Sequence, residues 1–549
     1  MSMEIIQSAA TELLVNVALA VLALSACQAR AAGPQDPAAG SLTGRIASDD
    51  GTPLAGVVVS DGVRVTQTDA EGMYALNSDK ELGYVFVSIP SGYMAAVDAT
   101  AIPQFFAYTA KPAEESERHD FTLTPVENTR HTLIAATDHH LADRESLDVG
   151  QFTAEGGFID DVKATAAAAS SPVYSICMGD MSWDEYWHKH GFMLPDFRRL
   201  YARHTFPCPV FNAMGNHDND PWCASDQEAS AAFRREIGPT YYSFNLGEVH
   251  YVVLDNIVYV NTGGREGAIG KLDYEVRVDQ RQLEWLKADL GTVADRSAPL
   301  VVVMHAQLHW WQRSGNGVAW KYAFTRDADQ LVSTLTGFRE VHLVTGHSHM
   351  NFRLLNGNLR EHNIAATSGT WWWTGQIHGD CAINTCLDGS PGGYEVFEVD
   401  GRDIRWHYKG IGLEDGCQFR AYDMNEVLKN ERIRSSGDFT AEGTAGGMND
   451  AYGENDILVN IWGWQPDWTV RVTENGRELR GVRVIGKDPL HKITYTRSTK
   501  PFQTAYNPHM WRYRASGPST TVRIEVTDSF GRTSAETMTR PKAFHIRMR

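Results

Sequence analysis

The sequence predicts an α/β protein in which a central domain of alternating strands and helices lies between two β modules. Residues 41–125 contain short β-branched runs separated by glycine-containing turns, the pattern of a small β-sandwich. Residues 127–366 alternate apolar runs of strand length with helix-like stretches, which indicates an α/β domain. Residues 367–549 return to paired strands around short turns, so we expect a second, mainly β module there.

Size and charge limit the classes of function. The 549 residues exceed one ordinary core, so about three folding units are expected. Lys and Arg number 50 against 68 Asp and Glu, a net charge of -18, and no basic cluster stands out. We therefore expect no nucleic-acid partner. An anionic small molecule would still bind if metal ions supplied positive charge locally.

Residues 1–27 are predicted to be a signal peptide and residues 28–40 a linker. The apolar run LLVNVALAVLALSA is too short to span a bilayer comfortably, and small residues precede Cys27. LSAC resembles the lipobox of bacterial lipoproteins, although no Lys or Arg precedes the apolar run. We expect an exported protein, periplasmic or attached to the outer membrane through a lipidated Cys27. A misassigned start and an ordinary cleaved signal are the alternatives.

The N-terminal module, residues 41–125, is predicted from GVVVSDGVRVTQTDAEGMYAL at residues 56–76. Its β-branched residues partly alternate, and Asp61-Gly62 and Glu71-Gly72 are typical of tight turns. The stretch resembles the transthyretin-like or carboxypeptidase-regulatory modules that precede many bacterial catalytic domains.

Six strands and three helices are predicted in the central domain. The strand candidates are apolar runs at residues 131–137, 172–178, 208–214, 249–255, 299–304 and 341–345. The helix candidates have helical composition and apolar spacing, at residues 164–171, 226–237 and 280–290.

Paired strands dominate the predicted C-terminal module. YEVFEVDGRDIRWHYKG, residues 394–410, turns at Asp400-Gly401, and residues 468–485 turn at Asn475-Gly476. Residues 520–536 have the pattern of a strand, a turn and a second strand. Cys381 and Cys386 are close enough in sequence to be disulfide candidates, and the lack of a CxxC pair argues against a structural zinc knuckle.

Five predicted central strands end in residue types that bind metals. In chain order the blocks are Asp138-His139-His140, Gly179-Asp180, Gly215-Asn216-His217-Asp218, His305 and Gly346-His347-Ser348-His349. In an open α/β sheet, ligands gather at the carboxyl ends of strands, so these blocks can converge. One His or Asp at a strand end is more often a turn residue, but five in order predict a site. Imidazole, carboxylate and amide ligands without thiolate suit Zn, Fe or Mn.

This order of blocks, DxH, GD, GNHD, H and GHxH, resembles the calcineurin-like metallophosphoesterases over the whole central domain. CLDGSPGGYEVFEVDG and DGCQFRAY, at residues 386–401 and 415–422, extend the resemblance to an exported bacterial type with β modules on both sides of the catalytic domain. The resemblance implies a central β-sandwich flanked by helices. It also implies a hydrolase of phosphate esters, acting on a small molecule or a lipid headgroup, with two divalent or trivalent transition metal ions and a bridging hydroxide.

The resemblance assigns roles to individual residues. One metal ion would be held by Asp138, His140, Asp180 and His349. The second, bridged by Asp180, would be held by Asn216, His305 and His347. His217 would contact the phosphoryl group or protonate the leaving oxygen, and Asp218 would orient the His217 ring.

Strand geometry separates the two histidines of ATDHHLAD, residues 136–143. In an extended segment Asp138 and His140 point to one side and His139 to the other. We therefore expect His140 to be the ligand, His139 to be a neighbour of the site or a packing residue, and Asp143 to belong to the following loop.

Aromatic and polar residues follow three of the blocks and either line a substrate pocket or pack within and between domains. They are Trp183, Asp184, Trp187, His188 and His190, then His309, Trp310 and Trp311, and finally Trp371, Trp372 and Trp373. Tyr241 and Tyr242 lie in a segment typical of the scaffold of these enzymes, and we assign them no catalytic role.

The motifs leave three functional alternatives open. They do not choose between phosphate monoesters and diesters, and a pyrophosphatase or nucleotidase would use the same site. A non-catalytic surface glycan-binding protein would carry degraded metal ligands, and none is degraded here.

Overall fold

The computed structural model describes residues 40–145, 147–314, 317–324, 326–374, 383–430, 433, 441–443, 449–450, 452–495 and 503–548. The expected signal peptide, the linker up to residue 39, Cys27 and Cys381 lie outside these residues. Within them, the free thiols are Cys177, Cys208, Cys223, Cys386 and Cys417. Across the same residues, no helix combines the length and apolarity needed to cross a membrane.

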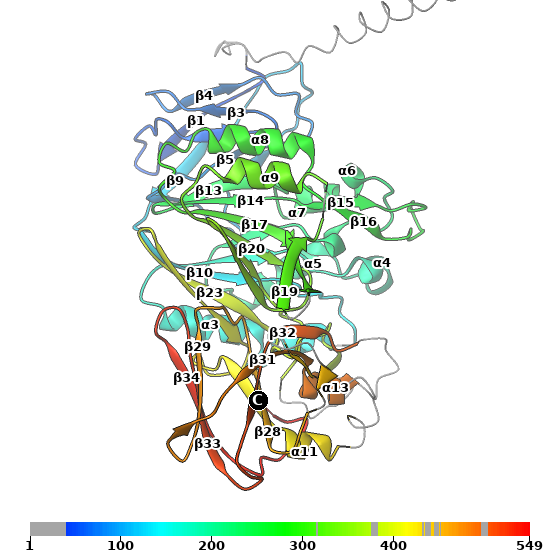
Figure 1. Cartoon of the computed structure of the whole chain (residues 1–549). Coiled ribbons are helices and arrows are strands. Elements are labelled where there is room, and N and C mark those ends of the chain that lie inside the picture. The colour runs from blue at the N-terminus through cyan, green and yellow to red at the C-terminus, as the bar shows by residue number, and fades with distance from the viewer. Residues whose placement is uncertain are drawn as a thin grey trace, which may run out of the picture.

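The central domain is a sandwich of two sheets, with the N-terminal module at one end and the C-terminal module at the other (Figure 1). The first sheet has the order β12-β11-β10-β23-β24, and the second has the order β13-β14-β17-β20-β22-β21. The α/β class expected for this domain is thus confirmed, because helices cover these sheets.

Parallel strands lie at one side of the first sheet and in the middle of the second, and all of them except β22 are apolar runs. In the first sheet β10 (Arg130–Ala136), β11 (Val173–Met178) and β12 (Val210–Ala213) are parallel. In the second, β14 (Val249–Val253), β17 (Leu300–Ala306), β20 (Val341–Gly346) and β22 (Leu359–Asn363) are parallel. Strands buried on both faces require such uninterrupted runs, which is why all six predicted strands were visible in the sequence. The antiparallel additions are β13 (Tyr242–Leu246) and β21 (Phe352–Asn356).

Helices cover the outer faces of the sandwich. The helix α8 (Gln280–Leu290) has the bounds predicted and buries Leu283, Trp285, Leu286 and Leu290. Asp279 caps its N-terminus, and the Asp279 carboxylate accepts from Gln282 N–H. With α9 (Ala328–Leu335), α8 packs near the second sheet. On the first sheet lie α3 (Phe158–Ala168), which begins before the predicted 164–171, and α5 (Leu194–His204). Shorter helices are α2 (Asp148–Thr153), α4 (Trp187–His190), α6 (Asp226–Ala229) and α7 (Ala231–Glu236).

The hairpin predicted at residues 394–410 forms, but it completes the central sandwich. β23 (Gly393–Asp400) pairs antiparallel with β10 and with β24 (Asp403–Gly410). A division at residues 366/367 therefore separates strands of one sheet. Alternation in a hairpin sequence reveals the pairing of its two strands and not the sheet that they join.

The N-terminal module shares its core with the sandwich. One sheet contains β1 (Leu42–Ser48), β4 (Met73–Leu76), β6 (Tyr93–Ala95), β8 (Glu117–Arg118) and β9 (Phe121–Pro125). The other contains β2 (Val58–Ser60), β3 (Val65–Gln67), β5 (Tyr84–Val87) and β7 (Phe106–Tyr108). Phe86 of β5 packs edge-on to Trp285 of α8, and one continuous apolar core joins the two parts.

The C-terminal module is also built from two sheets. The first contains β25 (Phe419–Asp423), β28 (Asp456–Ile461), β32 (Tyr506–Arg514), β31 (Val482–Lys487), β26 (Ala441–Gly443) and β27 (Asn449–Asp450). The second contains β30 (Arg477–Glu478), β29 (Thr469–Glu474), β33 (Thr521–Thr527) and β34 (Thr533–Thr539), so the turns predicted at Asn475-Gly476 and between β33 and β34 are present. The helices α11 (Met424–Leu428) and α13 (Pro489–Tyr495) accompany them.

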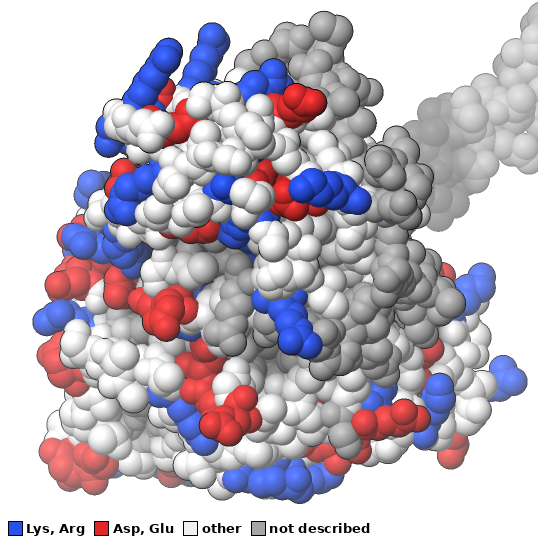
Figure 2. Space-filling view, turned by 90° about the horizontal axis from the view of Figure 1, so that it is seen from below, with Lys and Arg blue, Asp and Glu red and all other residues white. Residues whose placement is uncertain are grey.

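Two short hairpins lie outside the main sheets. They are β15 (Ile257–Val260) with β16 (Asp273–Val276), and β18 (His309–Ser314) with β19 (Gly317–Tyr322). Figure 2 shows the molecule from the end that carries the C-terminal module, and basic and acidic side chains are interspersed on that face.

Candidate metal centre

The predicted blocks meet where five central strands end. Asp138 and His140 follow β10, Asp180 follows β11 and Asn216 follows β12, all in the first sheet. His305 lies near the end of β17, and His347 and His349 follow β20, both in the second sheet. The ligand candidates therefore converge from both sheets at one edge of the sandwich.

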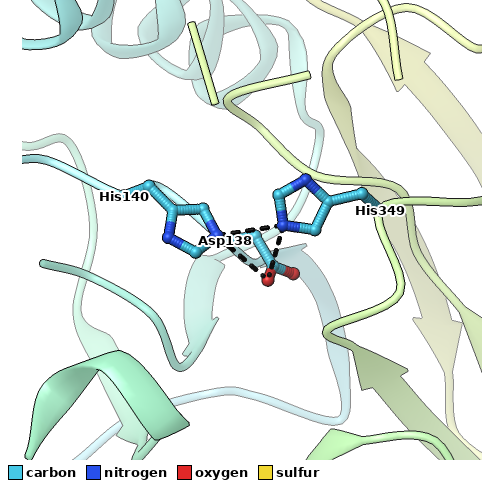
Figure 3. Close-up of side chains that lie close together, drawn as sticks. All are labelled: Asp138, His140 and His349. Atoms are coloured by element: carbon cyan, nitrogen blue, oxygen red, sulfur yellow. Dashed lines mark hydrogen bonds and ion pairs between the residues drawn. The ribbon is translucent and has the colours of Figure 1, made fainter. Parts of the chain in front are cut away.

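The first group of ligand atoms consists of Asp138, His140 and His349 (Figure 3). Nε2 of His140 lies 2.9 Å from Nε2 of His349. Oδ1 of Asp138 lies 3.3 Å from the His349 nitrogen and 3.5 Å from the His140 nitrogen. All three side chains are buried, and their donor atoms point toward one another.

The second group consists of Asp180, His305 and His347. Nε2 of His305 lies 3.3 Å from Oδ2 of Asp180, 3.1 Å from Oδ1 of Asn216 and 3.2 Å from Nδ1 of His347. Oδ2 of Asp180 is also 3.7 Å from Nε2 of His140, so this one oxygen lies between the two groups.

The donor set fits a cation in each group. Oδ1 of Asp138 is buried and accepts no hydrogen bond from the described residues. Nδ1 of His349 lies 2.9 Å from Gly369 O, and Nδ1 of His305 lies 2.8 Å from Met178 O, so each Nδ1 carries the hydrogen. Each Nε2 then presents a lone pair to the other ligand atoms, an arrangement that a cation between them stabilises.

A proton competes for the same place. Burial alone lowers the pKa of His305, but the charge of Asp180 outweighs it and raises that pKa to about 10. A cation held at Nε2 of His305 would therefore compete with a proton for that nitrogen.

The backbone of the ligands is unusual. Five of them have positive φ angles: Asp138 (56°), His140 (46°), Asp180 (52°), His347 (66°) and His349 (53°). Glycines next to them leave no room for a side chain, since a Cβ at Gly215 would lie 2.2 Å from Oδ1 of Asp180. The glycines of GD and GNHD are thus required by close packing.

His217 is oriented by a carboxylate other than the one predicted. Nδ1 of His217 lies 2.7 Å from Oδ1 of Asp184, whose Oδ2 accepts from the Tyr259 hydroxyl at 3.0 Å. Asp218, predicted to orient this ring, accepts instead from the backbone N–H groups of Gly215 (3.0 Å) and Ser182 (3.2 Å). The short helical turn at residues 216–218 directs the Asp218 carboxylate back to its own loop, which corrects the prediction.

His139 is a packing residue. Its ring lies among Phe152, Phe158 and Phe197, and neither ring nitrogen has a hydrogen-bond partner among the described residues. His139 therefore points away from His140, as predicted, but for another reason. β10 ends at Ala136, and the left-handed residues Asp138 and His140 flank His139, so the segment is not extended.

Two tryptophans form a wall beside the first group of ligands. The Trp183 ring is 5.5 Å from that of His140 and 5.8 Å from that of His217, and the Trp371 ring is 4.2 Å from that of His349. Both tryptophans are half-buried. Of the residues that we expected either at a pocket or in packing, Trp183, Asp184 and Trp371 therefore lie at the site.

The remaining aromatic and histidine candidates have structural contacts. Trp187 and Trp372 are buried in the core around α3 and α5. His188 stacks on Trp222, and His309 contacts Glu361 at 2.7 Å. His190, Trp310, Trp311 and Trp373 likewise contact other protein groups. The hydroxyls of Tyr241 and Tyr242 donate to Gly62 O and Asn212 O, in keeping with a scaffold role.

Tyr259 and Tyr274 were missed by the sequence analysis. Tyr259 contacts Asp184, and the Tyr274 hydroxyl lies 3.2 Å from Nε2 of His347. The runs IVYV and DYEV, which alternate weakly, were the signal for the hairpin that carries them. A long loop joins the two runs, so the sequence signature of a two-residue β-turn, which identifies tight hairpins, is absent between them.

Solved structures with similarity to this chain include the following three. A dimetal phosphatase from Danio rerio is 13% identical, with a TM-score of 0.34, over 52% of this chain and 97% of that one. The phosphopantetheinyl hydrolase of Mycobacterium tuberculosis is 14% identical, with a TM-score of 0.24, over 45% and 92%. Vacuolar protein sorting 29 from Cryptosporidium parvum is 10% identical, with a TM-score of 0.22, over 51% and 98%. No curated protein matches the sequence.

Family models cover most of the chain in three successive parts. Residues 131–351 match calcineurin-like phosphoesterase, residues 40–126 match the N terminal of calcineurin-like phosphoesterase, and residues 361–533 match the C terminal of calcineurin-like phosphoesterase. The match to calcineurin-like phosphoesterase at residues 131–351 includes all of the converging blocks described above. The chain therefore belongs to the calcineurin-like phosphoesterases that carry an N-terminal and a C-terminal module on either side of the catalytic domain.

Proposed function

We propose that this phosphoesterase hydrolyses small-molecule phosphate esters with a pair of transition metal ions and a hydroxide that bridges them. One observation supports this proposal above all. Two groups of imidazole and carboxylate donors lie close together, all of them buried except the half-buried His347, and a single oxygen of Asp180 lies between the groups.

The first ion would be held by Asp138, His140, Asp180 and His349. The second would be held by Asp180, Asn216, His305 and His347. Zn, Fe and Mn all suit these ligands. When bound, the ions supply positive charge that acidifies the attacking water and neutralises the phosphoryl oxygens.

His217 is placed to protonate the leaving oxygen. Burial alone lowers its pKa, but the charges of Asp180 and Asp184 raise the pKa of His217 to about 9. Nδ1 is engaged by Asp184, so the transferable proton is on Nε2. The side chain is 25% exposed, which gives a substrate access to it.

The leaving group would lie against the wall of Trp183 and Trp371. Both rings flank the first group of ligands, and aromatic faces suit a planar ring or a sugar. A small phosphate ester or a lipid headgroup, as a monoester or a diester, satisfies this arrangement. Export and attachment through a lipidated Cys27 remain part of the proposal, to be checked by labelling cells with a fatty acid.

The test combines metal analysis with a substrate panel. Protein reconstituted with Zn, Mn or Fe is assayed on phosphomonoesters, glycerophosphodiesters, cyclic nucleotides, nucleotide sugars and phospholipids. We expect about two ions per chain and activity on at least one class. Asp180→Asn is expected to lower kcat by roughly 100-fold or more, because it removes the charge between the two groups.

Asp79→Asn is the matched control, since Asp79 is 81% exposed and lies in the N-terminal module. It should leave kcat and metal content unchanged. Protein without bound metal, or full activity in Asp180→Asn, would overturn the proposal. Inactivity on the whole panel with both metals bound would favour a binding protein instead.

A further inference from the structure

The hairpin of β15 and β16 belongs to neither sheet of the sandwich, yet it reaches the metal centre. Its strands pair with each other, and β15 lies beside α6 at the side of the molecule (Figure 1). The register places Tyr259 directly opposite Tyr274. Residues opposite each other in an antiparallel pair share a face, so both tyrosines point the same way.

Tyr259 fixes the carboxylate that orients His217. Its side chain is 2% exposed, and its hydroxyl donates to Oδ2 of Asp184 at 3.0 Å. The other oxygen, Oδ1, faces Nδ1 of His217 at 2.7 Å. Burial, and next the charge of Asp184, raise the pKa of Tyr259 far above its usual value, so the phenol stays a donor. The Asp184 carboxylate is thus held at both oxygens.

Tyr274 contacts the opposite half of the centre. Its hydroxyl lies 3.2 Å from Nε2 of His347, while Nδ1 of His347 faces the second group of ligands, 3.2 Å from Nε2 of His305. When Nδ1 uses its lone pair for a cation, Nε2 carries the hydrogen and donates to the Tyr274 oxygen. Such outer contacts set the orientation of a ligating imidazole.

The hairpin is anchored rather than loose. Between its strands, the buried Asn261 donates to Pro221 O at 2.8 Å and Cys223 O at 2.9 Å, and its Oδ1 accepts from Leu272 N–H at 2.8 Å. The Tyr259 N–H donates to Oδ1 of Asp226 at 2.7 Å. The hairpin is therefore tied to the segment that directly follows the GNHD block, and His217 belongs to that block.

We propose that the β15–β16 hairpin is a positioning element of the active site, in which Tyr259 holds the Asp184–His217 pair and Tyr274 holds His347. The inference rests on the proposed function and adds two positioning residues to it. One cross-strand pair thereby sets the spacing between the proton donor and a ligand of the second metal ion.

The first test separates positioning of His217 from a general loss of structure. Tyr259→Phe removes only the donor to Asp184. A proton donor matters most for poor leaving groups, so we expect kcat on an alkyl phosphate to fall about tenfold or more. On p-nitrophenyl phosphate we expect less than a threefold change. In a His217→Gln background, Tyr259→Phe should have no further effect on the alkyl substrate.

The second test measures metal release and needs no substrate. Zinc-loaded protein is mixed with a chromogenic chelator, and the release of each ion is followed. Tyr274→Phe is expected to release one of the two ions roughly 10-fold faster and the other at the wild-type rate, because outer-shell partners change metal affinity by this order.

Tyr251→Phe is the matched control, since it also breaks a buried Tyr–His contact, between the Tyr251 hydroxyl and Nε2 of His131 at 2.7 Å, away from the centre. It should change neither the leaving-group dependence nor metal release. An equal loss on both substrates in Tyr259→Phe, or wild-type release in Tyr274→Phe, overturns the hairpin proposal. Failure of the wild-type protein to bind metal or to hydrolyse any ester overturns the proposed function instead, and zinc release still tests Tyr274 if the inactive protein binds metal.

Discussion

Most of the candidate ligand residues have a left-handed backbone conformation, which residues with a side chain disfavour. Each left-handed residue costs on the order of 1 kcal/mol, so Asp138, His140, Asp180, His347 and His349 together store appreciable strain. Backbone hydrogen bonds oppose it: His347 N–H donates to Oδ2 of Asp138 at 2.9 Å, and His140 N–H donates to Asp180 O at 2.8 Å. The protein itself therefore positions the candidate ligand atoms.

The two carboxylates near His217 should behave differently when each is changed to an amide. Asp184→Asn removes the charge beside Nδ1, so the pKa of His217 should fall and kcat on alkyl phosphates should drop about 10- to 100-fold. Asp218→Asn places an N–H₂ group near two backbone donors and should lower the free energy of unfolding by roughly 1–3 kcal/mol.

Steady-state kinetics on alkyl and aryl phosphates, with urea unfolding of the same variants, would distinguish the two residues. A large kinetic loss in Asp218→Asn at unchanged stability, with Asp184→Asn fully active, would restore the assignment expected from the sequence.

His139 should make the protein sensitive to acid. Burial lowers its pKa in the folded state to about 3, whereas the unfolded chain titrates near 6.5. The unfolded state therefore takes up the proton first, and the stability from neutral His139 is lost as pH falls from 6.5 to 3. At pH 5 this loss is roughly 2 kcal/mol.

His139→Phe is thus expected to raise the free energy of unfolding, and by more at pH 5 than at pH 8. The ring also fills the space among three phenylalanines without leaving two nitrogens unpaired. Urea unfolding at both pH values provides the measurement, with metal content as the check that His140 is undisturbed. An equal gain at both pH values would contradict the titration argument.

The predicted ligand residues that the structure brings together are those at strand ends, because long apolar strands are visible in the sequence pattern and their ends are defined. The sequence pattern could not show that Asp184, and not Asp218, contacts the His217 ring. Which carboxylate reaches His217 depends on the path of the loop after β11 and on a helical turn at residues 216–218, and neither leaves a periodic signal.

At the scale of elements, β23 closes the first sheet. It pairs with β10 along nearly the whole strand, and β10 directly precedes Asp138. Removing β23 would leave the edge of β10 without hydrogen-bond partners and would expose apolar residues such as Leu133. We therefore expect β23 to support the loop that carries Asp138 and His140, although the strand lies far along the chain.

A fragment of residues 40–366, which ends at the sequence-derived boundary, should aggregate or unfold at low temperature. A fragment of residues 40–410, which retains β23 and β24, should be the more soluble and the more heat-resistant of the two. Size-exclusion chromatography and thermal unfolding monitored by circular dichroism would compare them. Equal behaviour would show that β23 is dispensable for the sandwich.

Elements outside the sheets were the hardest to predict. Six of the seven parallel strands of the sandwich, all except β22, and the helix α8 were recovered, since long buried strands and an amphipathic helix have clear periodicity. The hairpins β15–β16 and β18–β19 were not predicted. Their strands have only four to six residues, and a sequence pattern this short is difficult to distinguish from that of a loop. The sequence of β23 also did not predict which sheet the strand joins, because this depends on its pairing with β10, which is distant in the chain.

On the scale of the whole molecule, the three parts recognised in the sequence are present, but they are not separate bodies. The N-terminal module and the sandwich share one apolar core, and Ile89 O accepts from Asn245 N–H at 2.8 Å across their junction. At the other end, Asp388 accepts from Asn351 N–H at 2.7 Å and lies 3.2 Å from Nε2 of His509 in the C-terminal module. Both modules thus support the segment between them.

The shared core has a consequence for how the chain can be divided. A protease cut near residues 126–129 would sever the backbone without separating the two pieces, because Phe86 and Trp285 would still bury each other's apolar surface. We expect the two fragments to behave as a split protein. Expressed separately, each would expose apolar surface and aggregate, and mixed together they would reassemble and recover activity by complementation.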